Sequence, residues 1–169
     1  MRIELDKLEG DADSFSYIYE PGELSLDEEN ARLTEPPSVQ GRLKRSGHEV
    51  RLRGSISAEA EVDCDRCLKP IAVPVRTEFE VTYVPAADYR AAETAELQEE
   101  DLSVSVFDEE TIDIDELVRE QILLALPLRA LCTEDCQGLC PVCGTNRNVQ
   151  PCACQTAERD PRWDALKNL

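Results

Sequence analysis

Strict alternation of apolar and polar residues marks the middle of the chain. From Val50 to Val62 every even position is apolar or small, and every odd position is charged or a serine. A period of two predicts a β-strand with one face on a core and the other in water. The alternation resumes from Ile71 to Tyr83, so the intervening Cys64-Asp65-Arg66-Cys67 is expected to lie at the tip of an antiparallel hairpin. Pro74 lacks a backbone donor, which predicts an edge position or a bulge there.

The sequence on both sides of this hairpin predicts further strands for the sheet and a helix that covers it. Val39–Leu43 and Leu102–Val106 also alternate and predict one further strand each. Ile114–Ala125 repeats apolar residues at helical spacing, after a suitable N-cap at Asp113 and before Pro127. We predict an α+β fold, in which an antiparallel β-sheet or partly open barrel is covered by one main helix at about residues 113–126.

The composition changes after residue 128. Six of the eight cysteines fall between Cys132 and Cys154, together with several glycines and prolines. Such a segment cannot bury a core of its own. We therefore predict a β-rich body at residues 1–128 and a Cys-rich, zinc-binding tail at residues 129–169 docked on the body, with Trp163 as its anchor. The Ala- and Glu-rich run between Pro85 and Asp101 is expected to be a mobile loop or frayed helix.

The chain is strongly acidic, and this narrows the choice of partners. Its 169 residues include 36 acidic and 18 basic side chains, for a formal net charge of −18, which opposes indiscriminate binding to nucleic acid. Residues 41–76 carry 8 basic and 5 acidic side chains, so a nucleic-acid contact is expected only in a local patch. The candidates are Arg51, Arg53, Arg66 and Lys69 near the hairpin tip, and Arg147 and Arg162 in the tail.

The cellular compartment bears on the chemistry of the cysteines. The N-terminal residues lack the apolar core of a secretory signal, and the uncharged run Gln121–Leu128 is far shorter than the roughly 20 residues that span a bilayer. We expect a cytoplasmic protein without membrane contact. In such a reducing compartment, eight cysteines favour metal thiolates over four disulfides.

The cysteine spacing predicts two structural Zn²⁺ ions. Four cysteines lie close together in the tail and fit one tetrahedral site: Cys140, Cys143, Cys152 and Cys154. The other four would then join the hairpin tip to the tail in a second site: Cys64, Cys67, Cys132 and Cys136. An alternative assigns one ion to Cys132, Cys136, Cys140 and Cys143, and pairs Cys152 and Cys154 with the hairpin tip.

Catalysis is not expected. Four thiolates leave no open position for a water on either ion, which is typical of structural sites. The single histidine, His48, is predicted to lie at the surface in a turn, so no Ser/His/Asp set is available. A thioredoxin-like use of Cys64 and Cys67 is disfavoured because strands rather than a helix flank the pair.

Several motifs, in order, resemble the YceD family of large ribosomal RNA subunit accumulation proteins. They are Cys64-Asp-Arg-Cys67, Glu120-Gln-Ile-Leu-Leu-Ala-Leu-Pro127, Cys136-Gln-Gly-Leu-Cys-Pro-Val-Cys-Gly144 and Asp160-Pro-Arg162. The resemblance, which runs from about Val50 to Leu169, implies a non-enzymatic bacterial or plastid factor needed for accumulation of 23S rRNA. Arg147 departs from the family pattern, which suggests leucine between Asn146 and Asn148.

Three hypotheses follow for the mode of action. In the first, a ribosome-biogenesis factor uses its basic patch to contact the large-subunit rRNA precursor or a ribosomal protein. In the second, an acidic, zinc-stapled adaptor binds a basic protein client without RNA contact. In the third, a redox sensor releases zinc when its thiolates are oxidised.

Overall fold

The chain forms two compact units. The computed structural model describes residues 1–7, 10, 12–91, 104–107 and 111–154. The first unit comprises Met1–Val62 and Ala72–Leu128, and the second comprises Asp63–Ile71 and Arg129–Leu169. The second unit thus combines the tip of the central hairpin with the Cys-rich tail. Trp163 and most of the acidic run before Asp101 lie outside the described residues.

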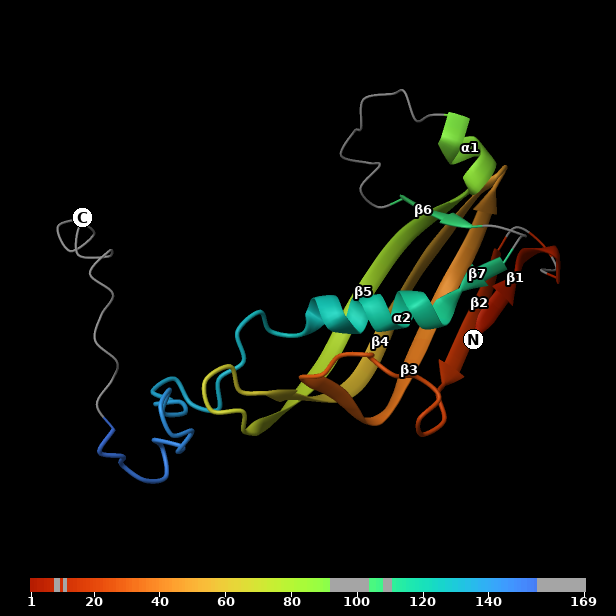
Figure 1. Ribbon diagram of the computed structural model, residues 1–169. Helices are drawn as coiled ribbons and strands as arrows, with labels where there is room; N and C mark the ends of the chain where they lie inside the picture. The colour runs from red at the N-terminus through yellow and green to blue at the C-terminus, as the bar shows by residue number, and fades with distance from the viewer. Residues whose placement is uncertain (8–9, 11, 92–103, 108–110, 155–169) are drawn as a thin grey trace. The chain divides into compact units, whose positions relative to one another are not determined.

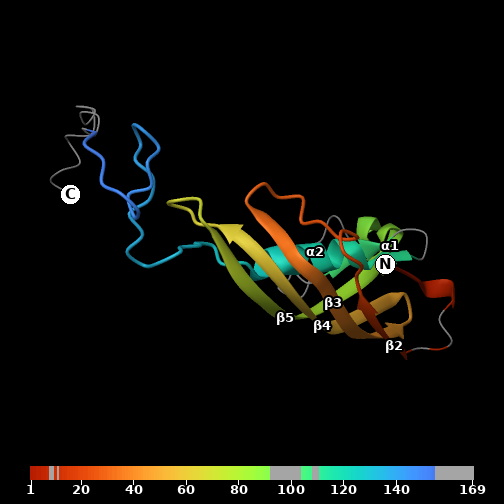
Figure 2. The ribbon, with the colours of Figure 1, turned by 90° about the horizontal axis from the view of Figure 1, so that it is seen from below.

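Long strands dominate the first unit (Figure 1). In chain order the elements are β1 (Arg2–Glu4), the 3₁₀ helix η1 (Leu5–Lys7), β2 (Ala12–Ile18), β3 (Ala31–Ser46), β4 (Glu49–Asp63), β5 (Pro70–Pro85), α1 (Ala86–Ala91), β6 (Val104–Phe107), β7 (Thr111–Asp113) and α2 (Ile114–Ala125). One sheet has the order β2-β3-β4-β5-β6, and β1 pairs with β7 in a second, two-stranded sheet. Helix α2 lies across one face of the larger sheet (Figures 1 and 2).

The predicted α+β class is confirmed: the sheet is mostly antiparallel, carries one main helix, and is not closed into a barrel over the described residues. One strand differs from the expectation. Strand β6 runs parallel to β5, with Thr82 opposite Val104. A parallel neighbour needs a crossover of about a dozen residues or more, and the stretch between β5 and β6 is long enough. Pro74 lies in the part of β5 that β6 does not reach.

The alternation of β4 places its apolar residues in the core. Val50, Leu52 and Ile56 are at most 2% exposed, whereas Arg51 and Arg53 face solvent. The antiparallel register sets Gly41 opposite Gly54. The rings of Phe15 and Phe79 occupy the space that a Cβ on these two glycines would fill, so close packing at the centre of the sheet depends on the absence of both side chains.

Helix α2 forms as its sequence predicts. The Asp113 carboxylate accepts hydrogen bonds from the backbone N–H groups of Asp115 and Glu116, at 3.0 and 3.3 Å, and so caps the N-terminus. The apolar stripe is buried at Ile114, Leu117, Val118 and Ile122. Ala125, which the helical pattern also assigned to the core, is exposed because it lies in the last turn.

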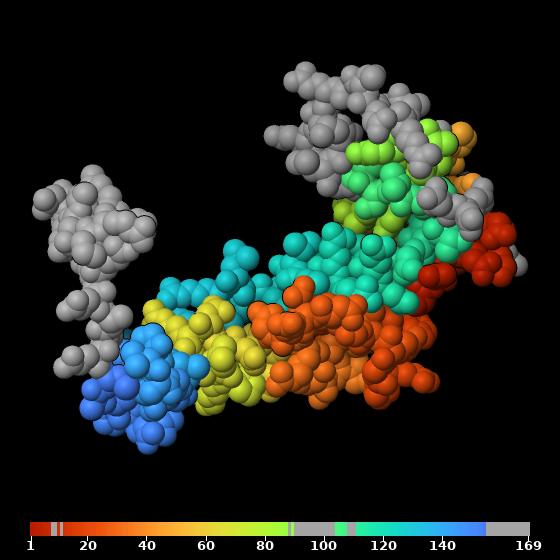
Figure 3. All heavy atoms as spheres, in the orientation of Figure 1, coloured from red at the N-terminus to blue at the C-terminus, as the bar shows by residue number. Residues whose placement is uncertain are grey.

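The segment between β2 and β3 is tied to α2. Arg119 donates a 2.8 Å hydrogen bond to the carbonyl of Ser25, and the space-filling view shows the two segments side by side (Figure 3). The hydroxyl of buried Tyr19 donates to the Asp115 carboxylate at 2.8 Å. Burial and this carboxylate both raise the pKa of Tyr19. These contacts hold α2 against the strands in one orientation.

The glycine pair provides a test of the packing. A Cβ at Gly54 would lie 2.6 Å from Cζ of Phe79 and would collide with the carbonyl oxygen of Gln40. We expect Gly54→Ala to lower the free energy of unfolding by about 1–3 kcal/mol, as overpacked cores do. Urea unfolding measures this. Ser57→Ala, on the exposed face of the same strand, is the control, and equal stability of the two variants would contradict the described packing.

Candidate metal centres

Four cysteines from two distant parts of the chain meet in what we call the first cluster: Cys64, Cys67, Cys132 and Cys136. The sulfur atoms of Cys64 and Cys136 lie 3.8 Å apart, and those of Cys67 and Cys132 lie 3.6 Å apart. Cys64, Cys67 and Cys136 are buried, and partly buried Ile71, Leu131 and Leu139 pack around them. This cluster is enclosed by protein.

Hydrogen bonds of Asp65 and Arg66 join the hairpin tip to the tail. The N–H of Asp65 donates to the carbonyl of Ala130, and the N–H of Ala130 donates to the Asp65 carboxylate, both at 2.9 Å. The Arg66 guanidinium donates to the Cys136 carbonyl at 2.7 Å, and the Arg66 carbonyl accepts from the N–H of Leu139 at 2.9 Å. These four bonds hold the two segments side by side, so the four sulfurs converge.

The second cluster is local and more exposed. It consists of Cys140, Cys143, Cys152 and Cys154. The N–H of Cys140 donates to the carbonyl of Thr145 at 2.8 Å, and the Cys140 carbonyl accepts from the N–H of Gly144 at 2.9 Å. Gly144 has a φ of 71°, a conformation that glycine adopts without strain. Cys140 is buried, whereas Cys143 and Cys154 are exposed.

The thiols divide into those that ionise readily and those that do not. Burial disfavours ionisation of Cys64, but backbone N–H groups of Cys132, Arg66 and Cys67 outweigh it and lower the pKa of Cys64 to about 6. In the second cluster the side chain and backbone of Thr145 lower the pKa of Cys143 to about 6. Hydrogen bonding to the Cys143 sulfur raises the pKa of Cys154 to about 12. The pKa of Cys67 in the first cluster is likewise raised, to about 12, so each cluster combines a cysteine of lowered pKa with one of raised pKa, which a bound cation would draw into ionisation.

The geometry of both clusters fits one tetrahedral ion each. Within each cluster all four sulfurs lie within 4.8 Å of one another, and all eight cysteines are free thiols. In a tetrahedron the ligands are about 1.63 bond lengths apart, so Zn–S bonds of about 2.3 Å place sulfurs about 3.8 Å apart. The two measured separations in the first cluster match this spacing. A disulfide would require a separation of about 2.05 Å.

The structure assembles the cysteines in the first of the two groupings that the sequence allows. Cys132 and Cys136 join the hairpin tip, and Cys152 and Cys154 join Cys140 and Cys143.

The predicted contact residues are distributed over both units. Arg51 and Arg53 lie on the exposed face of β4 in the first unit, where both approach Glu80. Arg66, Lys69 and Arg147 belong to the second unit and are exposed. Arg66 also serves the first cluster through its bond to the Cys136 carbonyl. Arg162 lies outside the described residues, and His48 is exposed, as expected, in the turn between β3 and β4.

Sequence reasoning overlooked three residues that orient the cysteines: Asp65, Thr145 and Asn148. The amide of Asn148 donates to the Cys136 sulfur at 3.3 Å, while its carbonyl oxygen accepts from the N–H of Gln137 at 2.7 Å. Asn146 in turn accepts from both the backbone and the side chain of Asn148. The Asn146-Arg147-Asn148 motif was the available signal, because two asparagines spaced to bond one another favour an ordered turn.

The protein is an α+β protein with a Cys-rich unit. Its sheet is mostly antiparallel and carries one main helix, and two clusters of four cysteines lie in the second unit. No solved structure matches the chain. The family described as large ribosomal RNA subunit accumulation protein YceD matches residues 52–169. The chain belongs to this family.

Relatives occur in bacteria and plants. An uncharacterized protein of Mycobacterium tuberculosis is 34% identical over 128 residues, which cover 76% of this chain and 59% of that protein. YlbN of Bacillus subtilis, also uncharacterized, is 28% identical over 156 residues, covering 92% of this chain and 86% of YlbN. The chloroplastic YCED homolog 1 of Arabidopsis thaliana, named a large ribosomal RNA subunit accumulation protein, is 36% identical over 58 residues, covering 34% of this chain and 18% of that protein.

The chain spans about three fifths of the length of its mycobacterial relatives. Within the described residues, none of the helices has the length and apolar character needed to cross a bilayer.

Paired substitutions test the grouping of the cysteines. If Cys140 and Cys152 share an ion, Cys140→Ser and Cys152→Ser each lose one metal ion per chain and the double variant loses no more. Cys64→Ser combined with Cys152→Ser should lose two ions. Elemental analysis of the purified proteins measures the content. Loss of a single ion from the Cys64/Cys152 double variant would instead support the alternative grouping.

Removal of metal should unfold the second unit selectively. Among its described residues, the buried hydrophobic positions are Ala130 and four of the cysteines, too little apolar surface to fold unaided. With a metal chelator we expect hydrogen exchange at the backbone amides of Asp65, Leu139 and Cys140 to accelerate at least tenfold, while paired amides of β3 and β4 keep their protection. Unchanged exchange at those three amides would contradict this.

Proposed function

We propose that this protein is a non-enzymatic ribosome-biogenesis factor required for accumulation of 23S rRNA, and that two structural Zn²⁺ ions hold its second unit. The observation that carries the proposal is membership of a family described by large ribosomal RNA accumulation, across residues 52–169. The named chloroplastic relative supports the same role. The factor acts by binding rather than by chemistry, in the cytoplasm of a bacterium.

Zinc is the ion that best fits the donor set. Thiolate ligands select Zn²⁺ and other soft ions over Mg²⁺ or Ca²⁺, and four sulfurs at tetrahedral spacing are typical of structural zinc. The residues that would hold the two ions are those of the first and second clusters. With four protein ligands, each ion stabilises a shape and leaves no position for substrate.

The partner is the large-subunit rRNA precursor or a ribosomal protein bound to it. The exposed cations Arg51, Arg53, Lys69 and Arg147, with Arg66 and Arg162, would supply contacts to phosphate. On a chain of net charge −18 such a contact must be local, because the acidic remainder repels a polyanion.

A second candidate is an adaptor that holds a basic ribosomal protein. The observation in its favour is the excess of 36 acidic over 18 basic side chains, since opposite charge accelerates association and gives specificity. This mode needs no contact with RNA.

Opposite charge changes separate the two candidates. Arg51→Glu with Arg53→Glu should reduce co-sedimentation with large-subunit precursors at least tenfold at low salt, because reversed charges repel phosphate. Replacing Glu99 and Glu100 by Gln and Asp101 by Asn should leave it unchanged, and should weaken binding only if a basic protein is the partner. Sucrose-gradient fractionation of lysates measures both variants. Absence of the unaltered protein from precursor fractions at low salt would contradict the proposed function.

A further inference from the structure

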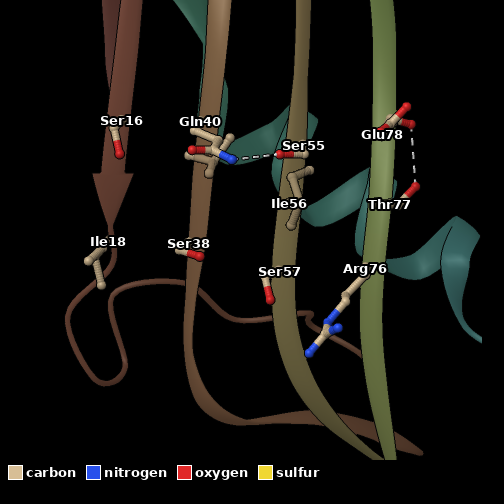
Figure 4. A pocket seen from close by; sticks show the side chains of 11 residues that line it. Ser16, Ile18, Ser38, Gln40, Ser55, Ile56, Ser57, Arg76, Thr77 and Glu78 are labelled. Atoms are coloured by element: carbon tan, nitrogen blue, oxygen red, sulfur yellow. Dashed lines mark hydrogen bonds between the residues drawn. The ribbon is translucent and has the colours of Figure 1, made fainter.

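The solvent face of the larger sheet carries a continuous, positively charged depression. A groove of about 1130 Å³ is lined by Arg42, Lys44, Arg51 and Arg53, among others. An adjoining groove of about 460 Å³ adds Arg76. The two share Ser16, Gln40, Ser55 and Glu78, and we call them together the sheet groove. Figure 4 shows the second part, with α2 behind the strands on the opposite face.

The sign of the charge in the sheet groove is opposite to that of the chain. Its lining contains five cations and two acidic residues, Asp13 and Glu78, and Glu80 lies beside it. Glu80 is shared, since it lies 2.5 Å from the Arg53 guanidinium and 3.9 Å from that of Arg51. In the described part of the chain, Arg42, Lys44 and Arg76 have no carboxylate within ion-pairing distance. Three cations are therefore left for an external anion.

The register of the strands places these cations against one another. Arg42 of β3 lies directly opposite Arg53 of β4, and Lys44 lies directly opposite Arg51. Like charges in directly opposed positions destabilise an antiparallel pair. Glu80 offsets part of this repulsion through Arg51 and Arg53, and a bound polyanion would relieve the remainder in both rows.

Neutral donors continue the same surface. The next rows set Ser16, Gln40 and Ser55 in register across three strands, followed by Ser38 opposite Ser57. The Gln40 amide donates to the Ser55 hydroxyl at 3.2 Å, and Figure 4 shows these side chains on one face. Hydroxyl and amide groups beside guanidiniums are typical donors to phosphate and sugar oxygens.

The described residues that line the groove offer no platform for bases. Phe15 is the aromatic residue of its lining, and the Phe15 ring packs in the space over Gly41 instead of standing free in the groove. Single strands are held by stacking on aromatic rings, while duplex RNA is held through phosphates and 2′-hydroxyls. We infer that the sheet groove binds the sugar–phosphate backbone of base-paired RNA without reading its sequence. This inference rests on the proposed function, because the duplex would belong to large-subunit rRNA.

The test uses a variant chosen to keep the fold intact. Arg42→Ala, Lys44→Ala and Arg76→Ala together remove the three unpaired cations. The matched control, Arg2→Ala, Lys7→Ala and Arg32→Ala, makes the same change in net charge at ion-paired cations outside the groove. Because the first variant removes opposed like charges, it should melt at the same temperature as the unaltered protein or higher.

Binding is measured by fluorescence anisotropy on the full chain, with a labelled RNA hairpin at increasing salt. The groove variant should bind at least tenfold more weakly at low salt, and its salt slope should fall by about 2 to 3, because each lost phosphate contact removes about 0.7–0.9. The control should bind as the unaltered protein does. Hairpins of different sequence should bind within about threefold of each other, and none more weakly than a single-stranded oligouridylate of equal length. Equal losses in both variants, or a preference for the single strand, would overturn the inference.

A cellular readout separates this inference from the proposed function. In cells whose own copy of the gene is deleted, the unaltered chain and the control variant should restore large-subunit rRNA, and the groove variant should not. If all three proteins restore large-subunit rRNA and the groove variant binds RNA normally, the inference that the sheet groove binds duplex RNA is wrong, while the proposed function is retained. If deletion leaves large-subunit rRNA unchanged, the proposed function fails, and the anisotropy result alone decides whether the groove binds RNA.

Discussion

Convergence of four sulfur atoms from two remote segments is the constraint on which the second unit depends. Cys67 and Cys132 are 65 residues apart in the chain, yet their sulfurs lie 3.6 Å from one another. Among the described residues of this unit, the buried hydrophobic positions are mostly the cysteines themselves, so little apolar packing holds these segments. A bound ion would contribute on the order of 10 kcal/mol, far more than loop closure costs over this length. With an ion bound in this way, metal binding and folding of this unit would be one equilibrium.

The grouping of the cysteines shows where sequence reasoning reaches its limit. The observed grouping closes loops of 65 and 9 residues, whereas the alternative closes loops of 4 and 85 residues. The entropic free energies of closing these two sets of loops differ by well under about 1 kcal/mol, so spacing alone does not choose between the two arrangements. The decisive contacts are the mutual hydrogen bonds of Asp65 with Ala130 and the bond from Asn148 to the Cys136 sulfur. Such contacts join residues that have no periodic relation. The Asn146-Arg147-Asn148 motif indicates a turn, but it does not indicate which cysteine the turn contacts.

Long periodic elements were predictable for the opposite reason. Helix α2 and strand β4 each repeat their apolar period several times, and burial follows the period. Strands β1 and β7 have three residues each and no period to detect. Strand β3 runs from Ala31 to Ser46, much further than the expected Val39–Leu43, because an irregularity in pairing between Glu35 and Ser38 interrupts its alternation. The connection before β6 is long enough for either direction, and the alternation of apolar residues is the same in a parallel and an antiparallel strand, so the pattern did not reveal that β6 runs parallel to β5.

Alternation in the sheet also explains how an acidic chain can present a basic surface. A period of two sends every second residue of β4 to the core, and it sends Arg51 and Arg53 to the same exposed face. The register then adds Arg42 and Lys44 from β3 to that face. Within about a Debye length, roughly 8–10 Å at physiological salt, these cations dominate the local field, and more distant carboxylates are screened. Net charge therefore limits where a polyanion can approach. Among the described residues of the sheet, strand register creates one face at which that approach is favourable.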